Sequence, residues 1–204
     1  MRGLTIYSTA GGNVEKYCKG NNIAFVADSG GFTDVPGTSA NTWFTDAMKW
    51  GGERGIITDT TFNPDDPCTR AQIVTFLWRA AGSPTYQGST KLFVDVLPSS
   101  YCYDAVLWAV EQGITTGTSA ATFSPSDTVT RGQAVTFLHR AAGSPAVSDN
   151  NPFRDVAANA YYIDAVQWAV GNSITTGTGN ANFSPNNNCT CAQIITILYR
   201  SQEN

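Results

Sequence analysis

The chain repeats one sequence pattern three times, and this repetition limits which folds it can adopt. Three similar segments begin at Asp46, Asp104 and Asp164, and each carries a Trp four residues after the Asp. Each segment is preceded by Phe-x-Asp-Val and followed by Phe-x-Pro and then by Thr-x-x-Gln. A period of about sixty residues with a fixed internal order indicates one supersecondary unit used three times. We therefore expect the function to lie between the copies rather than in a single catalytic pocket.

The second copy is predicted to form two helices joined by a loop. Apolar residues at helical spacing predict a helix from about Tyr101 to Gln112, which Gly113 ends. A second helix is predicted to start at Thr130, because Thr130 and Gln133 have the spacing of a capping box. The same capping pattern occurs in the other two copies, at Thr69 and Gln72 and at Thr190 and Gln193.

A single helix–loop–helix unit is too small to bury its own apolar stripe, so three units are expected to pack their long helices around a shared axis. This predicts a mainly α fold. The tryptophans in the middle of the first helices are expected to be core residues: Trp50, Trp108 and Trp168. The spacing from the Asp of Phe-x-Asp-Val to the Phe of Phe-x-Pro is identical in all three copies. We therefore expect packing to hold these two points in a fixed relation.

The charge pattern excludes several classes of partner. The net charge is −4, and the 12 Lys and Arg residues form no cluster, which argues against binding to nucleic acid or to anionic membranes. No apolar run approaches the length of a membrane span, so no membrane insertion is expected. The first residues lack the apolar stretch of a signal peptide. If the protein works outside the cell, we expect the chain to be a fragment of a longer protein.

The five cysteines and the one histidine do not form a recognisable catalytic or metal-binding pattern. Cys68 and Cys189 occupy the repeat position of Val129 and are expected to be buried. Cys191 follows closely, but no second Cys or His pair lies at zinc-ligand spacing, so neither a metal nor another cofactor is expected. One histidine without a triad pattern argues against an enzyme. A glycosidase would need two carboxylates across a cleft, whereas the repeated aspartates fit helix starts.

The landmarks of the repeat resemble the S-layer homology (SLH) motif. They are Phe-x-Asp-Val, an aromatic residue near the first helix, Gly-Ile, Gly-Thr, Phe-x-Pro and Thr-Arg-Ala-Gln, and they recur in register over residues 30–202. The resemblance implies a pseudo-threefold, three-pronged domain around a central three-helix bundle. Its repeats would span residues 30–88, 89–148 and 149–204. Residues 1–29 would form a short α/β appendage that resembles the last unit of a BspA-type leucine-rich repeat.

The resemblance also implies a function. The family anchors bacterial surface proteins non-covalently to secondary cell-wall polysaccharide, often through pyruvylated N-acetylmannosamine, in grooves between neighbouring prongs. The chain is thereby expected to be an extracellular, non-catalytic module of the bacterial cell surface. The alternative is a protein-interaction or self-assembly module whose prongs contact other surface proteins.

Arg70 and Arg131 are the strongest candidates for ligand contact. Each follows a helix-capping Thr, where the helix dipole disfavours a cation. An anionic ligand would explain the placement, because free N–H groups, the dipole and the guanidinium would converge on a carboxylate. The family resemblance assigns this Arg to ligand contact. The alternative is an ion pair with Asp34, Asp95 or Asp155.

The other candidates are aromatic, small or polar residues of the same landmarks. Trp43, Tyr101 and Tyr161 would stack on a sugar face or pack in the core. The remaining candidates are the glycine–threonine pairs Gly117, Thr118, Gly177 and Thr178, and the glutamines Gln72 and Gln133. Cys191 stands where the third copy should carry Arg. We therefore expect one or two working grooves rather than three.

Overall fold

The computed structural model describes residues 5–8, 17, 24–27, 43–59, 61–86 and 93–203. The chain divides into two compact units, residues 1–64 and residues 65–204. The boundary lies inside the first repeat, between its two helices. The landmark residues Phe32 and Asp34 lie outside the described ranges.

The first unit contains a small sheet and one helix. Strands β1 (Thr5–Ser8) and β2 (Ala24–Ala27) pair in parallel, with Thr5 opposite Ala24. Helix α2 (Thr45–Glu53) buries one face through Ala47, Met48 and Trp50. The parallel strand pair agrees with the α/β character predicted for the N-terminal appendage.

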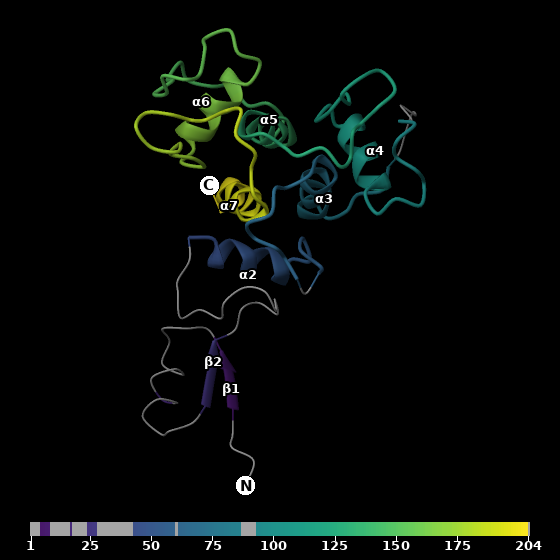
Figure 1. The fold of residues 1–204 in the computed structure, drawn as a ribbon, viewed down its shortest axis with the longest axis vertical. Helices are drawn as coiled ribbons and strands as arrows, with labels where there is room; N and C mark the ends of the chain where they lie inside the picture. The colour runs from purple at the N-terminus through teal and green to yellow at the C-terminus, as the bar shows by residue number, and fades with distance from the viewer. Residues whose placement is uncertain are drawn as a thin grey trace. The chain divides into compact units, whose positions relative to one another are not determined.

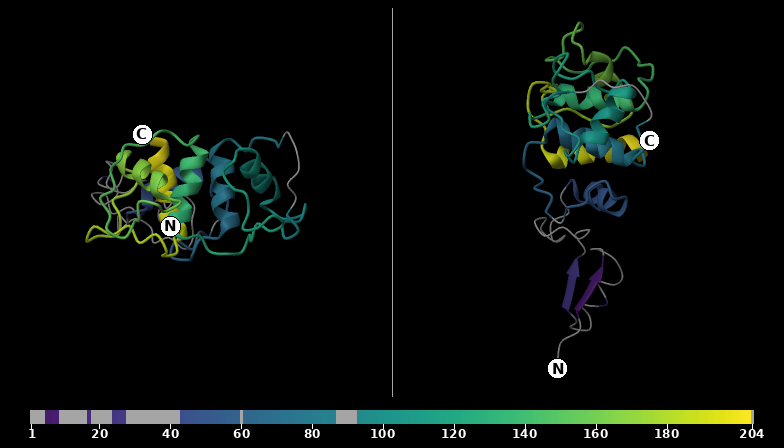
Figure 2. Two further views of the ribbon diagram at one scale, coloured as in Figure 1. Left: turned by 90° about the horizontal axis from the view of Figure 1, so that it is seen from above. Right: turned by 90° about the vertical axis from the view of Figure 1, so that its right-hand side faces the viewer.

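The second unit is built on three long helices that contact one another: α3 (Arg70–Ala80), α5 (Arg131–Ala141) and α7 (Cys191–Glu203). Figures 1 and 2 show them side by side as a bundle. Helix α4 (Tyr103–Glu111) packs on α3, and α6 (Ile163–Gly171) packs on α5. The bundle core comes from equivalent positions of the long helices: Ile73, Val74, Leu77, Ala134, Val135, Leu138, Ile194, Ile195 and Leu198.

Capping boxes begin the long helices, as the sequence predicted. The Thr69 hydroxyl accepts the backbone N–H of Gln72 at 3.2 Å, and the Gln72 side-chain oxygen accepts the Thr69 N–H at 2.8 Å. Thr130 and Gln133 exchange the same two bonds at the start of α5. Thr190 and Gln193 do so at α7. The three helices therefore start with one geometry.

Three residues in front of these caps form a closed ring of backbone hydrogen bonds. The N–H of Cys68 donates to the carbonyl of Cys189 at 2.8 Å, and the N–H of Cys189 donates to Val129 at 2.8 Å. The N–H of Val129 completes the ring by donating to the carbonyl of Cys68 at 2.9 Å. All three side chains are buried, as predicted. This axial ring joins the three repeats at the pseudo-threefold axis.

The constant spacing from Asp to Phe also has a structural cause. The Asp95 carboxylate accepts the N–H groups of Phe123, at 2.9 Å, and Ser124, at 2.7 Å. The Asp155 carboxylate accepts those of Phe183, at 2.8 Å, and Ser184, at 2.7 Å. Each bond closes a loop that begins and ends at a repeat landmark, so the spacing between the landmarks cannot drift.

The predicted fold class is confirmed: the protein is mainly α, with helix–loop–helix repeats around a central three-helix bundle. The predicted core tryptophans Trp50, Trp108 and Trp168 are buried. The longest described helix, α7, has 13 residues. Within the described ranges, no helix combines the length and apolar character that a membrane crossing requires.

Candidate ligand-binding site at the junctions between repeats

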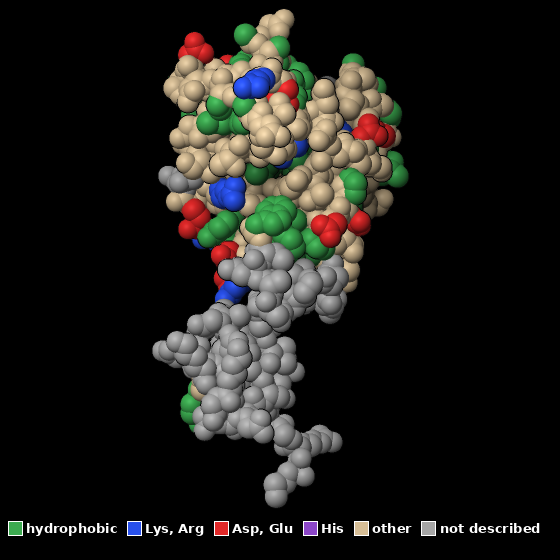
Figure 3. Space-filling model, turned by 60° about the vertical axis from the view of Figure 1, so that its left-hand side comes forward, with side chains coloured by type: hydrophobic (Ala, Val, Ile, Leu, Met, Phe, Trp, Pro, Cys, Tyr) green, Lys and Arg blue, Asp and Glu red, His purple; other side chains and the backbone are tan. Residues whose placement is uncertain are grey.

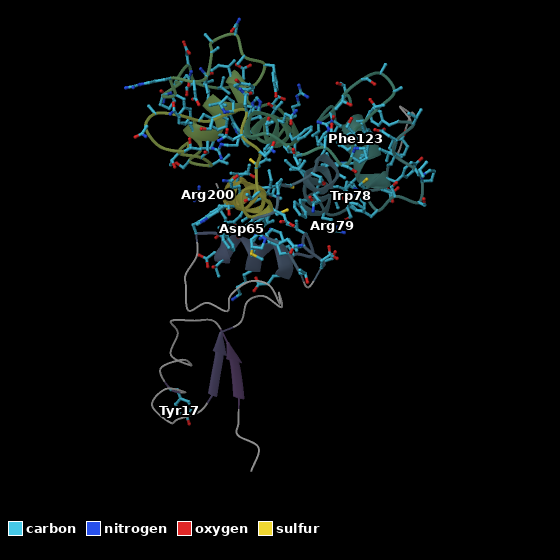
Figure 4. All side chains as sticks on the ribbon, viewed as in Figure 1. Tyr17, Asp65, Trp78, Arg79, Phe123 and Arg200 are labelled. Carbon is cyan, nitrogen blue, oxygen red and sulfur yellow. The ribbon has the colours of Figure 1, made fainter. Side chains whose placement is uncertain are left out.

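Arg70 crosses from the first repeat to the second. It is the first residue of α3, and its Nε donates to the carbonyl oxygen of Phe123 at 2.8 Å. Phe123, labelled in Figure 4, lies on the loop between α4 and α5. The guanidinium carbon lies 4.8 Å from the Phe123 ring centroid and 5.4 Å from that of Phe137. A cation over an aromatic face is stabilised by the ring quadrupole. Arg70 thus fastens the two repeats together.

Arg131 repeats this contact between the second and third repeats. Its Nε donates to the carbonyl oxygen of Phe183 at 2.7 Å, and its guanidinium lies 4.8 Å from the Phe183 ring centroid. The two arginines differ in exposure. Arg70 is only 5% exposed, whereas Arg131 is half-buried. The guanidinium of Arg131 is therefore the more accessible of the two.

The aspartates of these junctions bind backbone rather than arginine. Among the described residues, neither Arg70 nor Arg131 forms a salt bridge with a carboxylate, so the structure does not bear out the alternative of an ion pair with Asp95 or Asp155. Asp34, the third aspartate considered, lies outside the described residues. Burial lowers the pKa of Arg70, and Asp127 and Asp95 oppose this shift through their charges. Desolvation would raise the pKa of Asp95, but the N–H groups of Phe123 and Ser124 and the charge of Arg70 lower it below its usual value.

The glycine–threonine pairs shape the loops beside the arginines. Gly117 has a φ of +88°, and a Cβ there would collide with the Phe93 ring and the Thr122 carbonyl. Gly177 has a φ of +82° and the same crowding from Phe153 and Asn182. These glycines are needed for packing. The adjacent hydroxyls are exposed: Thr118 lies 2.8 Å from the Ser124 hydroxyl, and Thr178 lies 2.8 Å from that of Ser184.

The first turns of α3 and α5 offer an incoming anion no free N–H group of the kind the sequence suggested. The N–H groups of Arg70 and Ala71 donate to the carbonyls of Asp127 and Pro125, and that of Gln72 donates to Thr69. At the start of α5, the N–H groups of Arg131 and Gly132 donate to the carbonyls of Asn187 and Pro185. The expectation that backbone N–H groups would converge on a ligand is therefore wrong. The next repeat's loop already occupies them.

The candidate aromatic residues lie on the surface. Trp43 is 60% exposed, Tyr101 66% and Tyr161 67%, so none of them is a core residue. Partial burial raises the pKa of both phenols, and hydrogen bonds of Tyr101 with Thr69 and of Tyr161 with Thr130 oppose that shift. Each tyrosine thus leans toward the capping residue of the preceding repeat. Tyr161 also interacts electrostatically with Arg70.

These residues define two equivalent inter-repeat junctions. The first junction consists of Arg70, Asp95, Thr118, Phe123 and Ser124, with Tyr101 beside the cap of α3. The second consists of Arg131, Asp155, Thr178, Phe183 and Ser184, with Tyr161 beside the cap of α5. A sequence model described as the S-layer homology domain matches residues 31–74, 92–135 and 152–195. The chain belongs to the S-layer homology domain family. SLH domains are cell-wall anchoring modules of surface proteins.

Relatives of this SLH chain are much larger proteins, of which it spans less than a fifth. An endoglucanase of Bacillus sp. (strain KSM-635) is 40% identical over 111 residues, which cover 54% of the chain and 12% of the relative. A surface-layer 125 kDa protein of Lysinibacillus sphaericus is 35% identical over 49% of the chain and 8% of the relative. A cell surface protein of Thermoanaerobacter kivui is 29% identical over 55% of the chain and 16% of the relative. The matched region is thus a small part of each of these proteins.

The remaining candidate residues of the SLH repeats have structural roles. The side-chain oxygens of Gln72 and Gln133 are engaged in the capping boxes. Cys191 is the first residue of α7, where the other two long helices carry arginine, and it is buried. The Nε2–H group of His139 donates to the Pro145 carbonyl oxygen at 3.0 Å, and the His139 ring packs against Trp168. Trp78 makes the equivalent bond to Pro84 at 2.9 Å, which gives His139 a helix-end role.

Sequence reasoning missed the residues that receive the arginines. Phe123 and Phe183 were visible as the Phe-x-Pro landmark, but their carbonyl oxygens are the acceptors, and no side-chain pattern indicates which backbone carbonyl accepts a bond.

On the face in Figure 3, Lys and Arg side chains are scattered rather than gathered in one patch. Neither junction arginine has a salt bridge among the described residues, although the charges of Asp127 and Asp95 act on Arg70.

Proposed function

We propose that this SLH chain anchors a bacterial surface protein to the cell wall by binding secondary cell-wall polysaccharide at the two inter-repeat junctions. The observation that carries the proposal is the recurrence of one contact set at both junctions. Arg70 and Arg131, their carbonyl acceptors and the neighbouring threonine hydroxyls repeat in the same order. Repeated sites suit a polymer with repeated sugars, because two weak contacts on one chain raise the overall affinity.

The chemistry of each junction fits an acidic sugar. A guanidinium binds a carboxylate through two parallel hydrogen bonds, and its Nη atoms are not used in the bond to the phenylalanine carbonyl. We propose that a pyruvyl ketal carboxylate is the group it receives. The exposed Tyr101 and Tyr161 rings would cover the apolar face of a sugar, and the exposed Thr118 and Thr178 hydroxyls would bind its oxygens.

The two junctions are proposed to contribute unequally. The guanidinium of Arg131 is half-buried and can meet a ligand with little rearrangement. Arg70 is almost fully enclosed, so ligand contact there requires the side chain to shift. The second junction is therefore proposed as the principal site. Gln72, Gln133, Gly117, Gly177, Asp95 and Asp155 would support these sites without touching the ligand.

The experiment is co-sedimentation of the purified chain with cell-wall sacculi of Lysinibacillus sphaericus, either untreated or stripped of secondary polymer by acid. We expect binding to untreated sacculi only. The Arg131→Ala variant should lose at least about tenfold in affinity, the equivalent of one charge-assisted contact. Arg54→Ala is the matched control, because Arg54 is an exposed arginine of the first unit and belongs to neither junction.

Two outcomes would overturn the proposal. Equal binding to stripped and untreated sacculi would show that the polymer is not the ligand. Full binding by a correctly folded Arg70→Ala/Arg131→Ala double variant would show that the arginines do not bind the polymer. Polymer-independent oligomers, detected by light scattering, would favour a protein-interaction module. Circular dichroism melts of every variant separate loss of binding from loss of fold.

A further inference from the structure

The axial ring brings three of the four described cysteines to one place. Cys68 and Cys189 are two of its three members, and Cys191 follows two residues later. All three are at most 2% exposed. The third ring position holds Val129, so the sulfur atoms gather on the side of the ring where the first and third repeats meet.

Backbone pairing sets the relation between these cysteines. Pro67 and Thr190 form an antiparallel bridge, and the N–H of Cys191 donates to the carbonyl of Asp66 at 2.9 Å. In antiparallel segments, alternate side chains share a face. Cys68 on one segment and Cys189 and Cys191 on the other therefore point to the same side of the bridge. In this register Cys189 lies directly opposite Cys68, and Cys191, opposite Asp66, lies diagonal to Cys68 on the same face.

Cys68 and Cys191 are free thiols in the structure, and the Cys68 Sγ–H donates to the Thr69 carbonyl at 3.6 Å, which leaves its sulfur open toward Cys191. A side-chain hydrogen bond between them raises the pKa of Cys68 above its usual range and lowers that of Cys191. Burial adds to the rise at Cys68 and opposes the fall at Cys191. Cys189 interacts only electrostatically with Cys68, and burial raises its pKa to about 11. Of the three thiols, Cys191 thus forms a thiolate most readily.

We infer that Cys68 and Cys191 form a disulfide bond that joins the first repeat to the third. The chain itself connects repeat one to two and repeat two to three, so this bond closes the only side of the axial ring that lacks a covalent link. It also gives a reason for cysteine at residue 191, where α3 and α5 begin with arginine.

The chemistry is thiol–disulfide exchange with a low-molecular-weight disulfide or the disulfide of an oxidoreductase. The Cys191 thiolate attacks one sulfur of that disulfide, forming a mixed disulfide and releasing one thiolate. The Cys68 thiol then loses its proton and attacks the Cys191 sulfur, releasing the second thiolate. Two cysteine thiols are oxidised to one disulfide, and one disulfide is reduced to two thiols. Because both residues are buried, the exchange takes place while the chain folds.

The test is refolding of the full chain in a mixture of oxidised and reduced glutathione, followed by alkylation in denaturant. Of five cysteines, we expect three to be alkylated after oxidation and all five after reduction. Peptide mapping without reduction should recover the Cys68 peptide joined to the Cys191 peptide. Oxidation should raise the Tm by roughly 5–15 °C, since the bond closes a long loop.

Three variants assign the bond. Cys189→Val is the matched control, because Val129 already fills the equivalent position, and this variant should still lose two thiols. Cys68→Val and Cys191→Ala should keep every remaining thiol free and show no rise in Tm on oxidation. Five free thiols in the oxidised wild type would overturn the inference. So would a linkage that persists in Cys191→Ala, or mapping that joins Cys68 to Cys189, Cys18 or Cys102. If a variant does not fold, peptide mapping of the oxidised wild type still shows which cysteines are joined.

Discussion

Arg131 donates its Nε to the carbonyl oxygen of Phe183 at 2.7 Å across the junction between the second and third repeats. Arg70 makes the same bond to Phe123 one repeat earlier. A cation bonded to a carbonyl leaves its charge uncompensated, unlike one paired with a carboxylate. Each junction therefore holds an arginine that is fixed by a neutral carbonyl rather than by an ion pair, although the charges of Asp127 and Asp95 act on Arg70.

The two arginines should differ in their contribution to stability. We expect Arg70→Ala to lower the free energy of unfolding by about 2–4 kcal/mol, because it leaves the buried Phe123 carbonyl unpaired and removes contacts with two aromatic rings. Arg131→Ala should cost about 1–2 kcal/mol, because its site is partly open to water. Urea denaturation of both variants measures the difference. Equal losses would contradict the burial argument.

The stability contributed by Asp95 should depend on pH. Its pKa is lower in the folded protein than in the unfolded chain, so the unfolded chain binds the proton more tightly. The stabilisation is fully present above the unfolded pKa and is lost as the pH falls through the folded pKa. Asp95→Asn removes the charge and replaces one of the two accepting oxygens by an NH2 group that would face the Phe123 N–H, so it should cost roughly 1–3 kcal/mol at pH 7.

The gap between wild type and Asp95→Asn should therefore narrow as the pH is lowered from about 5 toward 3. Urea denaturation at several pH values measures this gap. Asp59→Asn is the control, because Asp59 is exposed and belongs to the first unit. A gap that stays constant with pH would show that the carboxylate charge is not what stabilises the loop.

Two glycines with similar backbone angles should respond differently to alanine. Gly117 has a φ of +88° in crowded surroundings, whereas Gly143 has a φ of +83° with no atom within 4 Å of an added Cβ. Gly143→Ala should cost about 1 kcal/mol for the left-handed conformation alone. Gly117→Ala should cost at least about 3 kcal/mol, because the Phe93 ring must also move. Thermal melts of the two variants give the comparison.

Removing one capping hydroxyl should weaken a long helix by a predictable amount. Thr130→Ala should lower the free energy of unfolding by about 0.5–2 kcal/mol, since the Gln133 N–H loses its acceptor. Thr130→Ser keeps the hydroxyl and should restore most of that loss. If serine were no better than alanine, the methyl group rather than the cap would be the stabilising part. Chemical denaturation distinguishes the two.

The sequence allowed the repeated architecture to be predicted because its signals are local. Helical periodicity, the Thr130 and Gln133 capping pair and the stop at Gly113 all act within a few residues. The constant distance from Asp95 to Phe123 even foretold a fixed contact. The satisfied N–H groups of Arg70 and Ala71 were not foreseen, because their acceptors are carbonyls of the next repeat. Backbone acceptors leave no mark in the side-chain pattern.

The arginines illustrate the same limit at the candidate site. Their unusual place at a helix start led to the prediction of ligand contact, and the structure shows that each also bonds the backbone of the next repeat. The sequence offered aspartate as the intramolecular partner, since opposite charges suggest a pair. In the fold, the carboxylates of Asp95 and Asp155 accept backbone N–H groups and so close their loops. The arginines donate to phenylalanine carbonyls instead. Only the three-dimensional arrangement reveals that competition.

The axial ring also fixes how many repeats one domain contains. Each of Cys68, Val129 and Cys189 uses its single N–H and one carbonyl on two different neighbours. A chain with two repeats would leave a donor and an acceptor unpaired in an apolar interior, at a cost of several kcal/mol. A fourth repeat would find no open place at the axis. The ring is therefore complete with three repeats and with no other number. Longer arrays of this motif must form separate domains of three repeats each.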